Sequence, residues 1–169
     1  MSNNLEERIS LNQYALFFCF AITVHNIEEA IWLPNWTQSS YAIQQPVTST
    51  EFHFAVLIIT ALAYLTAFFF GQFSHSQLAK YTFTGFLGSM IFNMFFPHLL
   101  STIIMQAYAP GLITGLLLIV PINTYILYQL HKKGHIKLKH IFLSTVMVGG
   151  ILLLLIPVLF KISNIMFIY

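Results

Sequence analysis

One turn of a strongly apolar segment carries three side chains that could do chemistry, namely His25, Glu28 and Glu29. On a helix of about 3.6 residues per turn, Glu28 lies about 60° to one side of His25 and Glu29 about 40° to the other. All three therefore share one face. A carboxylate at mid-membrane depth costs about 2.5–3.5 kcal/mol on insertion scales. An ionisable cluster in such a segment is a candidate functional site.

Other polar side chains lie at comparable positions in later apolar segments. Imidazole nitrogens and carboxylate oxygens are ligands of zinc, and a catalytic zinc keeps one position for water. Without a metal, the same groups could transfer protons, or could only hold helices together. We expect His25, Glu29 and His98 to be metal ligands or acid partners, Glu28 or Glu29 to be the general base, and Asn93 to orient the substrate or polarise a carbonyl, with Glu51 and His53 as additional candidates.

The composition is that of an integral membrane protein. Hydrophobic residues make up 57% of the 169 residues and charged residues only 7%, whereas a soluble domain carries about 25% charged residues. The mean hydropathy of +0.77 agrees. The length leaves room for one bundle, which we treat as a single domain over residues 1–169. A net charge of +2 gives no indication of nucleic-acid binding.

Continuous apolar runs predict an all-α bundle of transmembrane helices. A helix needs about 20 residues to cross a bilayer, and a β-barrel would show alternating rather than continuous hydrophobicity. Five runs meet this length, at residues 11–33, 52–70, 81–106, 111–130 and 140–160.

The basic residues predict the orientation of the bundle. Six of the seven lysines and arginines lie in the N-terminal tail and in the second and fourth connections, and Lys161 is the exception. The positive-inside rule then places the N-terminus in the cytoplasm of what we expect to be a bacterial plasma membrane. With this topology, the polar candidates gather in the outer half of the bilayer. The six residues are Arg8, Lys80, Lys132, Lys133, Lys137 and Lys139.

Proline and glycine positions refine the packing. Pro97 cannot donate a hydrogen bond to the carbonyl of Asn93, so the third helix should kink beside His98. Small residues let helices approach closely, within the chain or between copies of it in a homo-oligomer. The glycines concerned are Gly85, Gly88, Gly111, Gly115, Gly149 and Gly150.

Three segments carry a family resemblance. His25-Asn26-Ile27-Glu28-Glu29 resembles the signature of the HXXEE-domain family of small bacterial membrane proteins. The segment from Asn93 to His98 is similar to that family's Asn…His segment, and the segment from Tyr108 to Thr114 is similar to its Pro-Gly turn. The resemblance covers roughly residues 11–128 and implies a site at these positions. It implies no particular reaction.

Our leading hypothesis is a membrane-embedded enzyme with its His/Glu site in the outer half of the bilayer. It would use a divalent metal such as zinc, or acid–base chemistry, on a lipid or other hydrophobic small molecule. A transporter or proton-coupled channel is the first alternative, and a non-catalytic accessory protein with a structural His–Glu cluster is the second. Membrane lipids are the expected partners, and the role of the three histidines in the fourth connection stays open.

Overall fold

The computed structural model describes residues 2–39 and 45–167, and this part of the chain is helical with short turns. Five stretches are long and apolar enough to cross a membrane, which confirms the predicted all-α bundle. The elements are α1 (Ser2–Ser39), α2 (Ser49–Gln72), α3 (Gln77–Asn93), η1 (Met94–Leu99), α4 (Leu100–Met105), α5 (Leu112–Thr114), η2 (Gly115–Ile119), α6 (Val120–Lys132) and α7 (Leu138–Met166), where η marks a π-helical segment.

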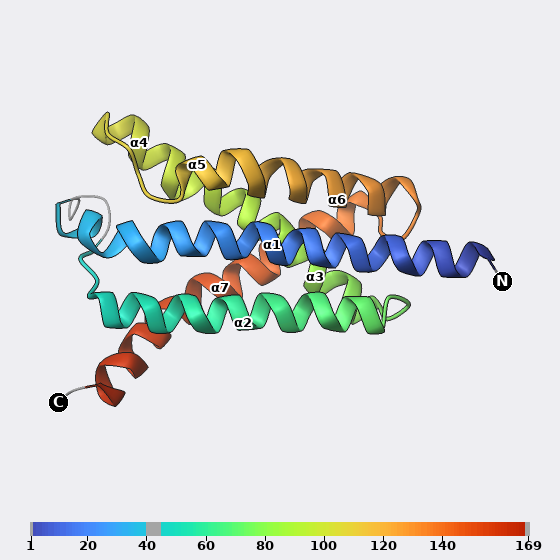
Figure 1. Cartoon of the computed structure of the whole chain (residues 1–169), viewed down its shortest axis with the longest axis horizontal. Coiled ribbons are helices and arrows are strands. Elements are labelled where there is room, and N and C mark those ends of the chain that lie inside the picture. Colours follow the sequence, from blue (N-terminus) through green and yellow to red (C-terminus); the bar gives the residue numbers. More distant parts are fainter. Residues whose placement is uncertain (1, 40–44, 168–169) are drawn as a thin grey trace.

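The connections gather at the two ends of the bundle (Figure 1). The N-terminus, the α2–α3 turn and the α6–α7 connection lie at one end. The α4–α5 connection, the start of α2 and the C-terminus lie at the other. The lysines of the α2–α3 and α6–α7 connections therefore share an end, as the charge pattern requires. Which end faces the cytoplasm stays a prediction.

Aromatic rings and close helix contacts hold the bundle together. Phe18, Phe70 and Phe83 are buried, and the rings of Phe70 and Phe83 stack with their centroids 4.4 Å apart. Helix α3 packs closely on α7, because a Cβ atom on Gly88 would lie only 1.9 Å from the hydroxyl of Thr145. The predicted close approach at this glycine is confirmed. Association of separate copies of the chain stays a prediction.

The third membrane span is interrupted where proline predicts a kink. Helix α3 ends at Asn93, and the π-helical segment η1 follows before the chain continues as α4. Within η1, Phe96 leaves helical geometry with φ −137° and ψ 109°. The next residue, Pro97, has no N–H with which to continue the helical ladder. This interruption carries His98 into the bundle, where its side chain is buried.

Helix α1 is longer than predicted and continues to Ser39 through Pro34, instead of ending at residue 33. Proline lacks the N–H that the carbonyl of Ala30 would bind within the helix. His53 of α2 supplies the missing donor, because its Nε2 lies 2.8 Å from the Ala30 oxygen. A buried or membrane-embedded carbonyl needs such a partner. The side chain of His53 therefore compensates for the proline and lets the helix continue.

Candidate metal centre

Three side chains from two spans converge inside the bundle. His25 and Glu29 lie one turn apart on α1, and the Nε2 of His25 is 3.6 Å from the Oε1 of Glu29. The Nε2 of His98, from η1, lies 2.9 Å from the same oxygen. One ligand atom from each residue falls within 4.8 Å of the others. The structure thus brings together the three residues that the sequence suggests as metal ligands.

The cluster is dry. His25 is 1% exposed, His98 4% and Glu29 9%. The two imidazole rings stand edge to face, 5.4 Å apart between centroids and at 87°. A buried carboxylate is tolerated only when it is paired or coordinates a metal. Within the described part of the chain, both ion pairs join Glu29 to one of these histidines.

The α4–α5 turn covers both imidazole rings. Gly111 has φ 89°, a backbone conformation that favours glycine. A Cβ atom at this position would lie 2.9 Å from Cε1 of His98 and 3.0 Å from Cε1 of His25. Three residues later, the hydroxyl of Thr114 lies 3.0 Å from Nδ1 of His25. A partner on the outer nitrogen fixes the ring so that its other nitrogen faces the centre.

Glu28 binds the α4–α5 turn, whereas its neighbour Glu29 contacts the histidines. Its Oε1 accepts a hydrogen bond from the backbone N–H of Gly111 at 2.9 Å and another from the hydroxyl of Tyr108. Its Oε2 accepts from the backbone N–H of Thr114 at 3.1 Å. These N–H groups begin the helix that starts at α5, where no side chain of its own caps them. Glu28, on the neighbouring helix α1, therefore holds the α4–α5 turn in place over the two imidazole rings.

Asn93 lies beside the cluster. Its Nδ2 is 3.2 Å from Nε2 of His98, the same nitrogen that faces Glu29. A single ring nitrogen cannot accept a hydrogen bond from one neighbour while it donates to another. If the side-chain amide of Asn93 is rotated by about 180°, its Oδ1 takes the place of Nδ2. Asn93 can then accept a hydrogen bond from a group in the centre, or contact that group directly.

Two additional candidates lie outside the cluster. Glu51 forms a capping box with Thr48 at the start of α2, where its Oε2 accepts from the Thr48 backbone N–H at 2.7 Å. Its Oε1 accepts from Nδ2 of Asn164 at 2.6 Å, which joins α2 to the end of α7. His53 binds the Ala30 carbonyl. Both residues have partners that account for them by fold alone.

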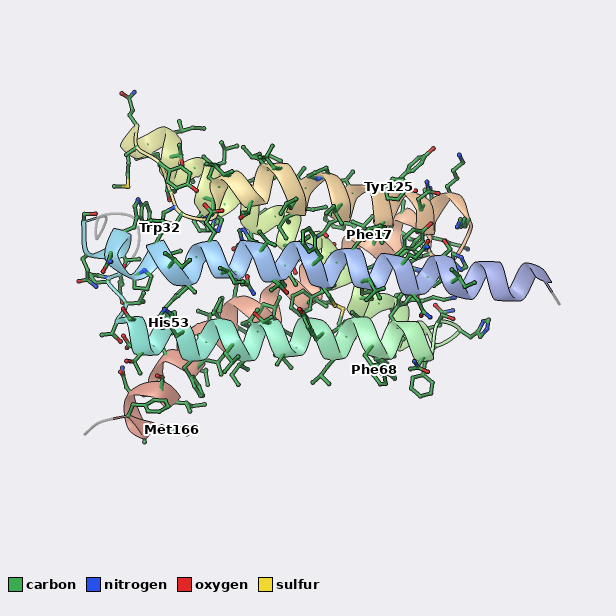
Figure 2. All side chains as sticks on the ribbon, in the orientation of Figure 1. Phe17, Trp32, His53, Phe68, Tyr125 and Met166 are labelled. Carbon is green, nitrogen blue, oxygen red and sulfur yellow. The ribbon has the colours of Figure 1, made fainter. Side chains whose placement is uncertain are left out.

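A groove opens beside the centre on the surface of the bundle. Its volume is about 400 Å³, and Glu28, Trp32, Tyr108, Ile113 and Thr114 line it. Trp32, which is labelled on α1 in Figure 2, is 58% exposed. Thr114 belongs to both places, because it lines the groove and contacts His25. Sequence reasoning missed Thr114 and Tyr108 as site residues. Their positions around the Pro-Gly turn were the only signal.

Comparisons with known proteins cover the part of the chain that holds this cluster. A family model described as "Protein of unknown function with HXXEE motif" matches residues 16–126, a range that holds every residue of the cluster. The chain is 58% identical to the uncharacterized protein YrkK of Bacillus subtilis (strain 168), over 89% of this chain and 96% of that protein. No solved structure matches the chain.

Proposed function

This chain belongs to the HXXEE family, whose description contains a motif and no reaction, and we propose its function from the site itself. The proposal is a membrane-embedded enzyme whose His25–Glu29–His98 centre holds a divalent cation, with zinc as the best candidate. Its substrate is a lipid or another hydrophobic molecule that reaches the centre from the side of the bundle. With the N-terminus in the cytoplasm, the centre lies in the outer half of the bilayer.

The convergence of the three ligand atoms carries the proposal. Two imidazoles and one carboxylate form the three-ligand set of catalytic zinc sites, which leaves a fourth position for water or substrate. In a tetrahedron with bonds of about 2.0–2.1 Å, neighbouring ligand atoms are about 3.3 Å apart. The separations of 2.9 and 3.6 Å from the Glu29 oxygen lie on either side of that value.

The hydrogen bonds of His98 fit either a cation or a proton between this ring and Glu29. The backbone of Pro110 hydrogen-bonds this ring, and Nδ1 is the nitrogen nearest the turn. A neutral ring that donates through Nδ1 presents a lone pair at Nε2. That lone pair would face the oxygen of Glu29 at 2.9 Å. A cation between the two atoms turns this unfavourable contact into two bonds, and a proton on Nε2 is the alternative.

The chemistry follows from what such a cation supplies. A bound zinc ion lowers the pKa of its water and polarises carbonyl or phosphoryl oxygens. The buried surroundings exclude bulk water and strengthen these electrostatic effects. Asn93 would contact the substrate oxygen, and Thr114 and the Gly111 turn would hold the imidazoles. If a proton replaces the cation, the close His98–Glu29 pair supports acid–base chemistry at the same place.

Elemental analysis of the purified protein tests the metal. We expect about one zinc ion per chain, lost in the His25→Ala and His98→Ala variants. His53→Ala and His75→Ala are matched controls, because His53 binds a helix carbonyl and His75 is exposed in the α2–α3 turn. Substoichiometric metal that is the same in all five proteins would refute the metal centre and leave the acid–base version.

A lipid profile tests the enzyme. Membranes from cells that produce the wild-type chain would be compared with membranes from cells that produce the His98→Ala variant at equal level. We expect a lipid or hydrophobic metabolite to accumulate or disappear only with the wild-type chain. Identical mass spectra would contradict an activity on an abundant lipid. Ion or proton flux in proteoliposomes that depends on Glu28 would instead support the transporter alternative.

A further inference from the structure

The groove beside the centre has the composition of a cation-binding site. We propose that it binds the ammonium head group of a hydrophobic amine, the class of molecule that the centre would then act on. The assignment of the amine as substrate rests on the proposed function. The binding itself does not, and it can be measured without reference to the metal.

The groove combines one carboxylate with two aromatic rings. Glu28 and Trp32 lie one turn apart on α1, and Tyr108 reaches the same groove from the α4–α5 connection. The faces of tryptophan and tyrosine rings attract ammonium groups, and aromatic rings are the usual walls of sites for quaternary ammonium ligands. The rings are accessible, because Trp32 is 58% exposed and Tyr108 44%.

The charge of the groove is also complementary to a cation. The three donors to Glu28 are two backbone N–H groups and a phenol, all of them neutral. Neither ion pair of the described residues involves this carboxylate. Glu28 is also absent from the set of ligand atoms that would hold the metal. An ammonium group can therefore approach a carboxylate whose hydrogen-bond donors are all neutral.

The dimensions favour a head group over a whole lipid. A volume of about 400 Å³ lies near the lower end of the roughly 300–1,000 Å³ of small-molecule sites. The exposed side chain of Ile113 continues the wall toward the surface, where an alkyl chain would lie in the membrane. Thr114 forms the end of the groove next to His25. A bound head group would thus be separated from the centre by Thr114 and the ring of His25.

A second groove provides a contrast within the same protein. It lies on the outer side of η2 and α6, has a volume of about 510 Å³ and contains no carboxylate. Its size and apolar walls would accept a chain, but nothing in it would distinguish a charged amphiphile from a neutral one. Its lining residues are Leu116, Val120, Pro121, Thr124, Tyr125 and Tyr128.

The fluorescence of Trp32 can report binding directly. The chain has two tryptophans, so Trp36→Phe leaves Trp32 as the only one. Purified protein in a neutral maltoside detergent would be titrated with hexyltrimethylammonium and, separately, with hexan-1-ol. We expect a saturable change with the ammonium compound at a concentration about tenfold lower than with the alcohol.

Substitutions then test the source of this preference. Glu28→Gln keeps the size of the side chain and removes its charge, and we expect the two compounds to bind equally. Tyr108→Leu should weaken ammonium binding while Glu28 is intact, and Glu51→Gln, at the same end of the bundle, should change nothing. Equal binding of both compounds by the parent protein, or an unchanged preference in Glu28→Gln, would overturn the proposal. The metal content of the same samples tests the centre separately.

Discussion

Replacing Gly111 by alanine should disrupt the centre although none of its three residues is replaced. The residue has φ 89°, and its added Cβ atom would lie 2.9 Å from His98 and 3.0 Å from His25. An alanine in the left-handed region costs about 1–2 kcal/mol. Overpacking a filled site costs about 1–3 kcal/mol more. Because both rings are buried and cannot retreat, we expect a total loss of about 2–5 kcal/mol of stability.

The same change should weaken metal binding. A shift of the turn moves the Thr114 hydroxyl from His25 and the Gly111 N–H from Glu28. Loss of such supporting contacts typically reduces metal affinity by about 10–100-fold. Competition with a chromophoric zinc chelator measures the affinity, and thermal unfolding in detergent measures the stability. Both assays can use the same preparation.

Gly134 supplies the matched control. It also has a positive φ, of 75°, but a Cβ atom there would meet nothing within 4 Å. Gly134→Ala should therefore cost about 1–2 kcal/mol from backbone strain alone and leave zinc affinity unchanged. If Gly111→Ala binds zinc as tightly as the wild type, or Gly134→Ala weakens zinc binding as much, the role given to the turn is refuted.

Three further predictions concern the bundle. Gly88→Ala should destabilise the bundle by about 1–3 kcal/mol, because α3 and α7 are in close contact there. Gly150→Ala should stabilise it by about 0.5–1 kcal/mol, because the added Cβ atom would meet nothing within 4 Å. Thermal unfolding in detergent measures both effects. His53→Ala should cost about 1 kcal/mol, because it removes a carbonyl's donor, and leave metal content unchanged, and His53→Gln should restore part of the stability. The orientation can be tested with single cysteines in a cysteine-free background and a membrane-impermeant maleimide. A cysteine in place of His75 should react only after the cells are opened, and a cysteine in place of Asn164 should react in intact cells. The reverse pattern would show that the N-terminus faces outward.

Helical spacing and topology were enough to predict that His25, His98 and the adjacent glutamates lie together. The spacing of His25 and Glu29 puts them on one helix face, and the alternating direction of the spans brings His98 to the same depth. The sequence could not tell which adjacent glutamate faces the histidines. That choice depends on where the α4–α5 turn docks, since backbone N–H groups of the turn hold Glu28. It also could not show that His53 binds a carbonyl left free by a proline in another helix.

The motif on α1 supplies two of the three residues of the centre, and the irregular segment η1 is needed for the third. In a regular α-helix, residues five apart point about 140° away from each other, so Asn93 and His98 could not face the same partner. Between the two residues the backbone leaves helical geometry at Phe96, so this restriction no longer holds. Here the two side chains meet at 3.2 Å, and His98 reaches Glu29 at 2.9 Å. The interruption of the third span at Pro97 is therefore needed to bring His98 into the site. A His-x-x-Glu-Glu sequence on a helix without such a partner would lack both the third ligand and the amide beside it.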